Sequence, residues 1–471
     1  MIKTLVILGA SGDLTTRFLL PALVRLHHAG RLPEEFRIIG IARDEWDTAM
    51  FRCHVEEKMK AGMSQAVSFS YDRVLAKIEY FPADVTNREC IAGILCKMTD
   101  PIVVYLALPP ALFQPTVETL AAVGLPQRSK LVLEKPFGTS LASAQGLNIL
   151  LHESFSEQDV FRLDHFLGKQ TVQNILGLRF ANRVFEPLWT AQHIERVDIV
   201  WDETLTVTGR SLFYDETGAL RDMIQNHLLQ LLALIGMEPL HSLDERTLRD
   251  RKLDVLQAVR RLSAEEIIQQ TIRGRYGQGT IVGQSVPAYV NEQGVHPDRH
   301  TETFAQVRLA IDNWRWAGVP FLLRTGKALR QDRREIAIHF KHVPHLAFGH
   351  HTQPQPNVLK IELNPDRIML SVNLNGSGDL CDLERVELDR TFVSEDLPPY
   401  ARLLLDVLAG DPTLSIRNDE TEESWRIVEP ILAVWDEGGV SLTEYPAGSD
   451  GPVDAATVPE RDRQYSGERS G

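Results

Sequence analysis

The chain has 471 residues, and 50 Lys and Arg against 64 Asp and Glu give it a formal net charge of −14 at pH 7. A net acidic chain without a basic run is a poor binder of nucleic acids and of anionic membranes, so neither is expected as a partner. The 43% apolar and 24% charged residues argue against general disorder. The length allows two or three domains.

The cysteines and the apolar stretches indicate the cellular compartment of the protein. Cys53, Cys90, Cys96 and Cys381 form no C-x-x-C pair, so we expect neither a metal site nor a disulfide framework, and a reducing compartment is indicated. The longest apolar stretch, residues 228–237, is too short to span a bilayer. The N-terminal stretch is typical of a first strand and not of a secretory signal. We therefore expect a cytoplasmic protein.

Residues 1–170 alternate apolar runs with helical patterns, which predicts a doubly wound, Rossmann-like α/β domain that binds a dinucleotide. Uninterrupted apolar runs are typical of strands buried on both faces of a parallel sheet. The run at residues 4–8 is of this kind, and the other predicted strands are residues 36–42, 102–108 and 130–133. After the first run, apolar residues recur at helical spacing over 15–28, and Pro21 predicts a kink or a late start of that helix.

From about residue 195 the pattern changes to strict alternation, which predicts a large, mostly antiparallel sheet with one polar or interface face. The alternating segments are residues 196–207, 305–313, 334–340, 358–364, 367–374 and 383–389. A helical block, 218–236, lies between the first two. We assign residues 171–447 to this β+α domain of substrate binding and dimerisation. Residues 448–471, rich in Gly, Ser, Pro and charge, are expected to form a disordered tail.

A glycine turn, G-A-S-G-D-L, follows the first predicted strand. It places Gly9 and Gly12 where the backbone can approach a pyrophosphate, and the amides of the next helix provide an anion site. An ordinary strand–helix turn is the alternative, but the position after the first strand favours a dinucleotide. Arg43, at the tip of the second strand, can pair with a 2′-phosphate and favours NADP. Asp44 beside it keeps NAD as the alternative cofactor.

The segment LVLEKPFG, at 131–138, brings Glu134 and Lys135 to the end of a strand. In open α/β folds ligands bind at this carboxyl edge of the sheet. Pro136 is a candidate for a cis peptide bond that shapes a tight turn. Lys135 can donate to a sugar hydroxyl or to a cofactor phosphate. Taken alone, a surface lysine after a strand is the simpler interpretation.

Two further segments carry titratable side chains. Asp164, His165 and Lys169 fall within six positions, a set that suits an anionic substrate and an oriented base, although a charged helix cap is the alternative. Asp222 and His227 interrupt an otherwise apolar helix. Five positions place them about 140° apart on a regular α-helix, where they can flank a cleft without sharing a face. A single His on an apolar helix is usually a core residue, so a partner carboxylate such as Asp164 decides the interpretation.

Eight segments then occur in order over residues 5–433: GASGDL, IARD, YLALPPALF, LEKPFG, RLDHFLGKQ, YDETGALRDMIQNHLLQ, IDNWRWAGVPFLLRTGKAL and ESWRIVEPIL. Together they resemble the glucose-6-phosphate dehydrogenase family. The resemblance implies oxidation of glucose 6-phosphate at C1 to 6-phosphogluconolactone with hydride transfer to NADP, the first oxidative step of the pentose phosphate pathway. It also implies packing of the large sheet against a second subunit, as a homodimer or homotetramer.

The resemblance assigns roles to individual residues. His227 matches the base that takes the C1 hydroxyl proton, and Asp164 matches its partner. The positions that match sugar and phosphate binding are Lys135, His165, Lys169, Glu203, Asp222 and Lys327. The positions that match the dinucleotide site are Gly9, Ser11, Gly12, Asp13, Arg43 and Lys135. A carboxylate beside an imidazole raises its pKa and stabilises the imidazolium that such a reaction forms.

Three positions depart from the family's pattern. Phe166 stands in place of a tyrosine, Phe18 in place of a basic residue, and Asp332 in place of a basic residue after Lys327. Each lost charge-assisted hydrogen bond weakens phosphate binding by about 1.5–3 kcal/mol. The same chemistry on another hexose phosphate or a modified aldose is therefore the alternative, and a catalytically silent homologue is the other.

Overall fold

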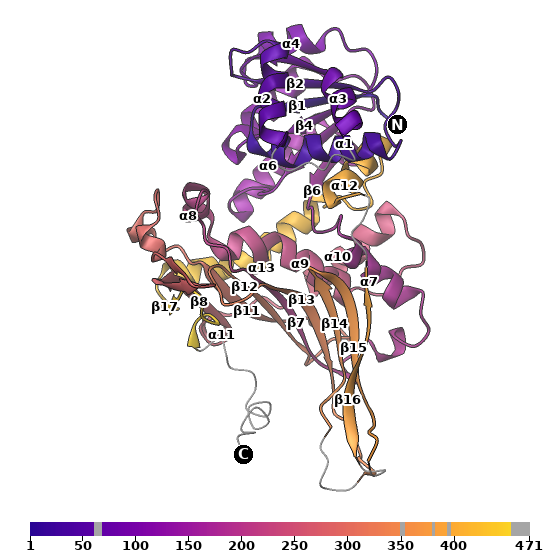
Figure 1. The fold of residues 1–471 in the computed structure, drawn as a ribbon, viewed down its shortest axis with the longest axis vertical. Helices are drawn as coiled ribbons and strands as arrows, with labels where there is room; N and C mark the ends of the chain where they lie inside the picture. The colour runs from indigo at the N-terminus through magenta and orange to yellow at the C-terminus, as the bar shows by residue number, and fades with distance from the viewer. Residues whose placement is uncertain (61–67, 349–353, 379–381, 393–396, 454–471) are drawn as a thin grey trace. The chain divides into compact units, whose positions relative to one another are not determined.

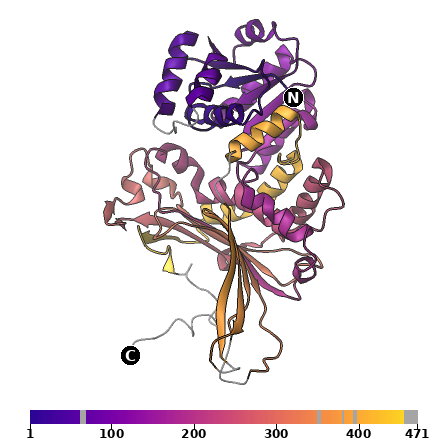
Figure 2. The same cartoon turned by 45° about the vertical axis from the view of Figure 1, so that its right-hand side comes forward.

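The structure is a computed structural model that describes residues 1–60, 68–348, 354–378, 382–392 and 397–453. They form two compact units (Figure 1; Figure 2 gives a second view). Unit 1 comprises Met1–Asn174, Glu238–Leu253 and Ser394–Trp425, and unit 2 comprises Ile175–Met237, Asp254–Val393 and Arg426–Gly471. Two late segments thus join the N-terminal part of the chain in unit 1. Most of the predicted tail, from residue 454 on, lies outside the described residues.

Unit 1 is built on a six-stranded parallel sheet with the strand order β3-β2-β1-β4-β5-β6. The strands are β1 (Thr4–Leu8), β2 (Arg37–Ala42), β3 (Ile78–Pro82), β4 (Ile102–Leu106), β5 (Lys130–Glu134) and β6 (Val160–Leu163). Its helices include α2 (Thr48–Lys60), α3 (Ser68–Ala76), α4 (Arg88–Leu95), α5 (Phe113–Val123) and α6 (Leu141–Ser154). The apolar runs are buried strands, which confirms the predicted Rossmann-like fold of this part.

The helix after the glycine turn begins with one π-helical turn, η1 (Thr15–Leu19), and continues as α1 (Leu20–His28). Pro21 lies where η1 passes into α1, and the residues before it, from Thr15 on, are already helical. The late start that Pro21 predicts is therefore wrong, and the helix instead changes from π-helical to α-helical form directly before the proline.

One helix of unit 1 comes from far along the chain. α12 (Pro399–Ala409) packs against α1 and contributes its apolar face to the core of the unit. Figure 1 shows the two helices together, α12 in orange and α1 in indigo. Leu404 and Val407 are fully buried in the same cluster as Leu23 of α1. The sequence patterns did not predict that residues near 400 belong to this unit.

A buried polar network anchors β6. Arg162 is 1% exposed and donates to Glu157 at 2.7 Å and to Asn148 at 3.0 Å. Its backbone N–H also donates to the Ser415 hydroxyl at 2.9 Å. A buried guanidinium is costly unless its hydrogen bonds are satisfied, so these contacts fix the position of the strand. Asp164 follows β6 directly, at the start of the turn that leads to α7.

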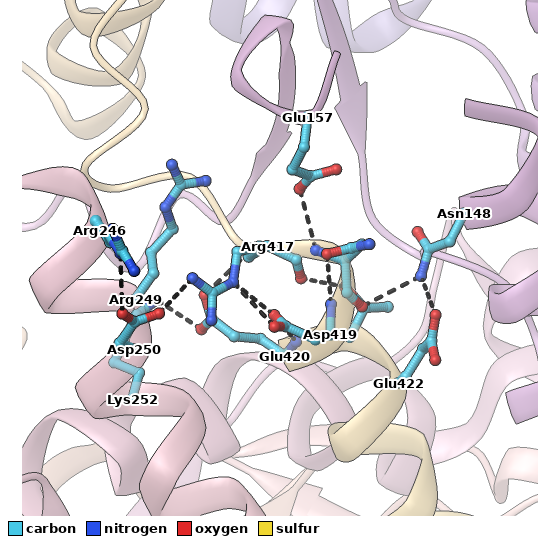
Figure 3. Close-up of polar contacts among 12 residues, drawn as sticks. Asn148, Glu157, Arg246, Arg249, Asp250, Lys252, Arg417, Asp419, Glu420 and Glu422 are labelled. Carbon is cyan, nitrogen blue, oxygen red and sulfur yellow. Dashed lines mark hydrogen bonds and ion pairs between the residues drawn. The ribbon is translucent and has the colours of Figure 1, made fainter. Parts of the chain in front are cut away.

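The network continues into the late segments of the unit, as Figure 3 shows. Lys252, on α10 (Glu245–Ala258), pairs with Glu420, on α13 (Asn418–Asp436), at 2.8 Å, and both side chains are fully buried. Arg417 just before α13 donates to Asp250 of α10 at 2.6 Å. Ion pairs therefore tie α10 to the start of α13.

Unit 2 is built on a nine-stranded sheet with the order β16-β15-β14-β13-β7-β12-β11-β8-β17. The strands are β7 (Ile194–Asp202), β8 (Thr271–Gly277), β11 (Phe304–Ala310), β12 (Pro320–Gly326), β13 (Arg333–Phe340), β14 (Val358–Leu363), β15 (Asp366–Asn375), β16 (Leu383–Thr391) and β17 (Leu442–Pro446). All neighbours are antiparallel except β7 with β12 and β8 with β17. The predicted alternating sheet is confirmed, while β8, β12 and β17 were not predicted.

The predicted helical block, residues 218–236, comprises the end of α8 (Ser211–Ala219), a π-helical stretch, η6 (Leu220–Leu228), and α9 (Leu229–Gly236). Within this block, η6 packs against β11 and β12. The remaining elements are α7 (Gln170–Phe180), α11 (Ala264–Gln270) and the hairpin β9 (Gly279–Ile281) with β10 (Gln284–Val286). Within the described ranges, every helix is too short or too polar to cross a membrane.

The strand order of unit 1 reverses between β1 and β4, which is where open parallel sheets bind ligands at their carboxyl edge. Gly9 follows β1 at this point with φ +86°, and its N–H donates to the Ile41 carbonyl at 2.8 Å. A Cβ on Gly9 would lie 2.3 Å from the carbonyl oxygen of Ala107, which follows β4. Only glycine therefore fits at this turn.

We expect Gly9→Ala to weaken NADP binding roughly tenfold or more, because the clash and the positive φ must displace the turn. Isothermal titration with NADP measures the change. Gly30→Ala is the matched control, since Gly30 also has a positive φ of +64° but no heavy atom within 4 Å of the added Cβ. Equal affinities in the two variants would contradict the role of the turn.

Candidate active site

The carboxyl edge of the parallel sheet carries the predicted residues of unit 1. Gly9, Ser11, Gly12 and Asp13 follow β1, Arg43 follows β2, Lys135 follows β5, and Asp164, His165 and Lys169 follow β6. Parallel strands end at the same edge, so these residues share one side of the sheet. Asp164 and His165 lie in the turn that follows β6, several residues before α7 begins at Gln170. The two residues therefore do not cap α7.

Arg43 is exposed at the tip of β2. In the part of the chain that the structure describes, its guanidinium forms no hydrogen bond or ion pair. Hydrogen bonds from Thr86 lower the pKa of the nearby Asp84, and the charge of Arg43 adds to this effect. Arg43 therefore has its donors available for an anion. Together with the close backbone approach at Gly9, it fits a dinucleotide that carries a 2′-phosphate.

A buried carboxyl directly precedes Lys135. Glu134 is 9% exposed and accepts hydrogen bonds from the hydroxyls of Tyr105 and Tyr400. Burial, against the effect of the Tyr105 hydrogen bond and with a smaller contribution from the charge of Asp164, raises the pKa of Glu134 to about 7. Sequence reasoning gave Glu134 and Tyr400 no role. The sequence does show that Glu134 is an acidic residue at the end of an otherwise apolar strand, and this pattern could have indicated a role for it.

The turn after β6 holds its side chains closely. Asp164 is 1% exposed, and its Oδ1 accepts the N–H of Phe166 at 2.9 Å. The carbonyl of Asp164 accepts the N–H of Leu167 at 3.1 Å. The imidazole of His165 lies parallel to the ring of Tyr400, with centroids 5.7 Å apart. Phe166 is buried, so position 166 presents an apolar ring to the interior.

In unit 2, Asp222 and His227 lie in the π-helical stretch, and both are buried. The expected geometry was that of an α-helix, in which five positions separate side chains by about 140°. The i→i+5 hydrogen bonds of a π-helix instead place residues five apart on successive turns. The two side chains therefore lie on one side of the helix. Glu302 accepts the N–H of Leu220 at 2.9 Å, where the stretch begins.

Unit 2 also brings Glu203 and Lys327 together as an ion pair. They follow β7 and β12, which are parallel neighbours and end at the same edge. Arg334 also contacts Glu203, at 3.3 Å. The carboxylate of Asp332 accepts the N–H of Thr204 at 2.7 Å and pairs with Arg334 at 3.1 Å. Thr204 and Arg334 thus provide hydrogen-bond donors for the carboxylate that stands at position 332.

The structure therefore gathers the predicted residues in two groups. The carboxyl edge of the sheet in unit 1 holds Gly9, Arg43, Lys135, Asp164 and His165 with their neighbours. Unit 2 holds the Asp222 and His227 pair on one helix and the Glu203 and Lys327 pair at the ends of two strands. Each group combines cationic, anionic and imidazole side chains, which suits the binding of a phosphorylated polyol and proton transfer.

Glu134 predicts a pH dependence of stability. Its pKa is about 7 in the folded chain against an ordinary value of 4.5, so the folded state binds more protons between these values. Stability therefore falls as pH rises from about 4.5 to about 7. Glu134→Gln removes this titrating group, so the variant should not lose stability in this way. The free energy of unfolding of the variant minus that of the unsubstituted chain should therefore increase by about 3 kcal/mol between pH 4.5 and 8.

Urea unfolding at several pH values measures this difference. Glu153→Gln, which replaces an exposed carboxyl on α6, controls for the loss of one charge. A stability difference for Glu134→Gln that stays constant with pH would rule out the buried carboxyl as the titrating group.

Comparison with known proteins places the chain in a family. Residues 6–174 match the model of the NAD binding domain of glucose-6-phosphate dehydrogenase, and residues 176–466 match that of its C-terminal domain. The glucose-6-phosphate 1-dehydrogenase of Mycolicibacterium smegmatis is 42% identical, with 98% of this chain and 97% of that protein covered. That of Bacillus subtilis is 38% identical, with 96% and 95% covered.

Two solved structures are similar throughout. One is a glucose-6-phosphate dehydrogenase in complex with its substrate glucose-6-phosphate, with a TM-score of 0.89 and 31% identity over 100% of this chain and 99% of that one. The other is the glucose-6-phosphate 1-dehydrogenase from Mycobacterium avium, with a TM-score of 0.84 and 36% identity over 96% of both chains. Matching models over both halves and relatives at about 40% identity show that this chain belongs to the glucose-6-phosphate dehydrogenase family.

Proposed function

We propose that this protein oxidises glucose 6-phosphate at C1 to 6-phosphogluconolactone with NADP, the first oxidative step of the pentose phosphate pathway. The observation that carries the proposal is the group of Lys135, Asp164 and His165 at the ends of β5 and β6, on the same sheet edge as the glycine turn of β1. The family to which the chain belongs and the sugar phosphate bound in a similar structure support it.

The chain offers groups that would hold the cofactor. Gly9, Gly12 and the first amides of the following helix hold the pyrophosphate, with Ser11 and Asp13 beside them. Arg43 would pair with the 2′-phosphate, and Lys135 would donate to a cofactor phosphate or to a sugar hydroxyl. When bound, the nicotinamide ring accepts the hydride from C1 of the sugar.

His227 acts as the base in this proposal. Loss of hydride from C1 builds positive charge there, and removal of the C1 hydroxyl proton by the imidazole relieves it. Asp164 holds the imidazole in the productive tautomer and stabilises the imidazolium that forms.

The remaining residues bind the substrate. His165 and Lys169 hold the 6-phosphate, and Lys327 lies at the phosphate end of the sugar. Lys135, Glu203 and Asp222 bind sugar hydroxyls. Asp332 weakens the phosphate pocket less than its charge suggests, because Thr204 and Arg334 already bind its carboxylate. Phe166 offers no hydroxyl, so oxidation of another hexose phosphate or a modified aldose is the second candidate.

We expect His227→Asn to lower kcat by roughly 10²- to 10⁴-fold, the usual contribution of a general base. NADPH absorbance with glucose 6-phosphate measures the rate. His193→Asn, an exposed histidine of the same unit, should leave turnover unchanged. Undiminished turnover in His227→Asn would reject His227 as the base.

A substrate panel separates the candidate functions. Several hexose phosphates and free aldoses are each tested with NADP and with NAD. Preference for glucose 6-phosphate supports the proposal, and preference for another sugar phosphate supports the second candidate. Equal activity on free glucose would show that the phosphate pocket is not used, and no activity on any sugar would indicate a silent homologue.

Arg43→Ala should raise the KM for NADP roughly 10- to 100-fold and leave the KM for NAD nearly unchanged, because only NADP carries the 2′-phosphate. Steady-state kinetics with both cofactors measure the effect. Arg37→Ala, which removes an arginine from the other end of β2, is the control. A parallel rise for both cofactors would contradict a contact with the 2′-phosphate.

We also infer a homodimer or homotetramer in the cytoplasm. One face of the large sheet carries a groove of about 640 Å³ lined by charges of both signs, among them Arg196, Asp198, Arg333, Glu335 and Lys360. Such a face can pair with its own copy about a two-fold axis. Sedimentation as a monomer at micromolar concentration would refute the assembly. Free, exposed Cys53, Cys90 and Cys96 suit a reducing compartment.

A further inference from the structure

A column of four rings lies along the carboxyl edge of unit 1. The ring of Phe18, in the helix after the glycine turn, is 5.3 Å from that of Tyr400 between centroids. Tyr400 in turn stacks on His165 at 5.7 Å with an angle of 8° between the ring planes. Phe166 closes the column with its ring nearly perpendicular to that of His165, at 4.9 Å between centroids. A nearly parallel stack fixes the plane of the imidazole, which otherwise rotates about two side-chain bonds.

The ring of Tyr400 is itself held at both ends. Its backbone begins α12, whose apolar face is buried in the core of the unit. Its hydroxyl donates to the buried Glu134, which also accepts the hydroxyl of Tyr105 in β4. Tyr400 therefore cannot swing away from His165 without breaking a buried hydrogen bond.

The turn that carries His165 also lies directly against the start of α12. A Cβ on Gly168 would lie 2.7 Å from the carbonyl oxygen of Pro399, the residue before Tyr400. The backbones at Gly168 and Pro399 are thus as close as a glycine allows. The stacked residues His165 and Tyr400 are near neighbours of these two positions in the sequence. Helix and turn are fixed relative to each other at two points.

We infer that Tyr400, braced by Glu134 and Tyr105, is a positioning residue that sets the orientation of the His165 imidazole for the phosphate of the substrate. The inference rests on the proposed function for the identity of that substrate. The geometry itself, a histidine stacked on a tyrosine anchored in another segment, lies wholly within unit 1.

Kinetics of two variants test the inference. Tyr400→Leu removes the stack and should raise the KM for glucose 6-phosphate about tenfold, equivalent to about 1.4 kcal/mol. The kcat and the KM for NADP should change less than about twofold, because His165 binds the phosphate and takes no part in proton transfer. Tyr400→Phe keeps the ring, so its KM should stay within about threefold of the original value.

Tyr71→Leu is the matched control, since it removes a buried tyrosine ring from the core of the same unit. Tyr71→Leu should lower thermal stability without changing the KM for the sugar phosphate. An unchanged KM in Tyr400→Leu, or an equal rise in Tyr71→Leu, would overturn the inference.

A spectroscopic measurement separates this inference from the proposed function. In the full chain labelled with ¹³C at histidine C2, the His165 signal is assigned by its loss in His165→Asn. The ring current of Tyr400 should displace this signal, and the displacement should vanish in Tyr400→Leu but remain in Tyr400→Phe. A signal that stays in place in Tyr400→Leu overturns the inference even in an active enzyme. If no sugar is oxidised, the proposed function fails while this measurement still decides the role of Tyr400.

Discussion

The close approach of the chain after β1 to the chain after β4 is the constraint on which the site of unit 1 depends. Gly9 and Ala107 are so near that no side chain fits between them, and this contact lies where the strand order reverses. Parallel pairing then delivers the ends of β2, β5 and β6 to the same edge. A glycine, an arginine, a lysine and an aspartate from distant parts of the sequence thus become neighbours on one edge through strand pairing alone.

Local sequence patterns predicted the parts of the fold that local forces determine. Apolar runs marked the buried strands and alternation marked the half-exposed ones, because each pattern depends on a few adjacent residues. The polar residues at strand ends were found for the same reason. Pro21 did not mark a helix start, because the chain is already helical before it. The roles of His227 and Asp164 came from the resemblance to a family, since spacing alone left each of them with an ordinary structural interpretation.

The features that the sequence did not predict depend on contacts between distant segments. Arg162 meets Ser415 across 253 positions, and Tyr400 reaches the edge only because α12 packs on α1. Parallel pairing of β12 with β7 joins residues more than a hundred positions apart, which no periodicity reveals. The π-helical form of residues 220–228 also escaped prediction, and with it the shared face of Asp222 and His227.

The return of late segments into unit 1 has a consequence for biosynthesis. The apolar face of α1 is covered by α12, and the buried charge of Lys252 is neutralised by Glu420. When only the first 174 residues have been synthesised, the apolar face of α1 is therefore still exposed to solvent. The nascent chain completes this unit only after residue 425 has emerged, when the whole strand-rich sequence between residues 254 and 393 has already been translated.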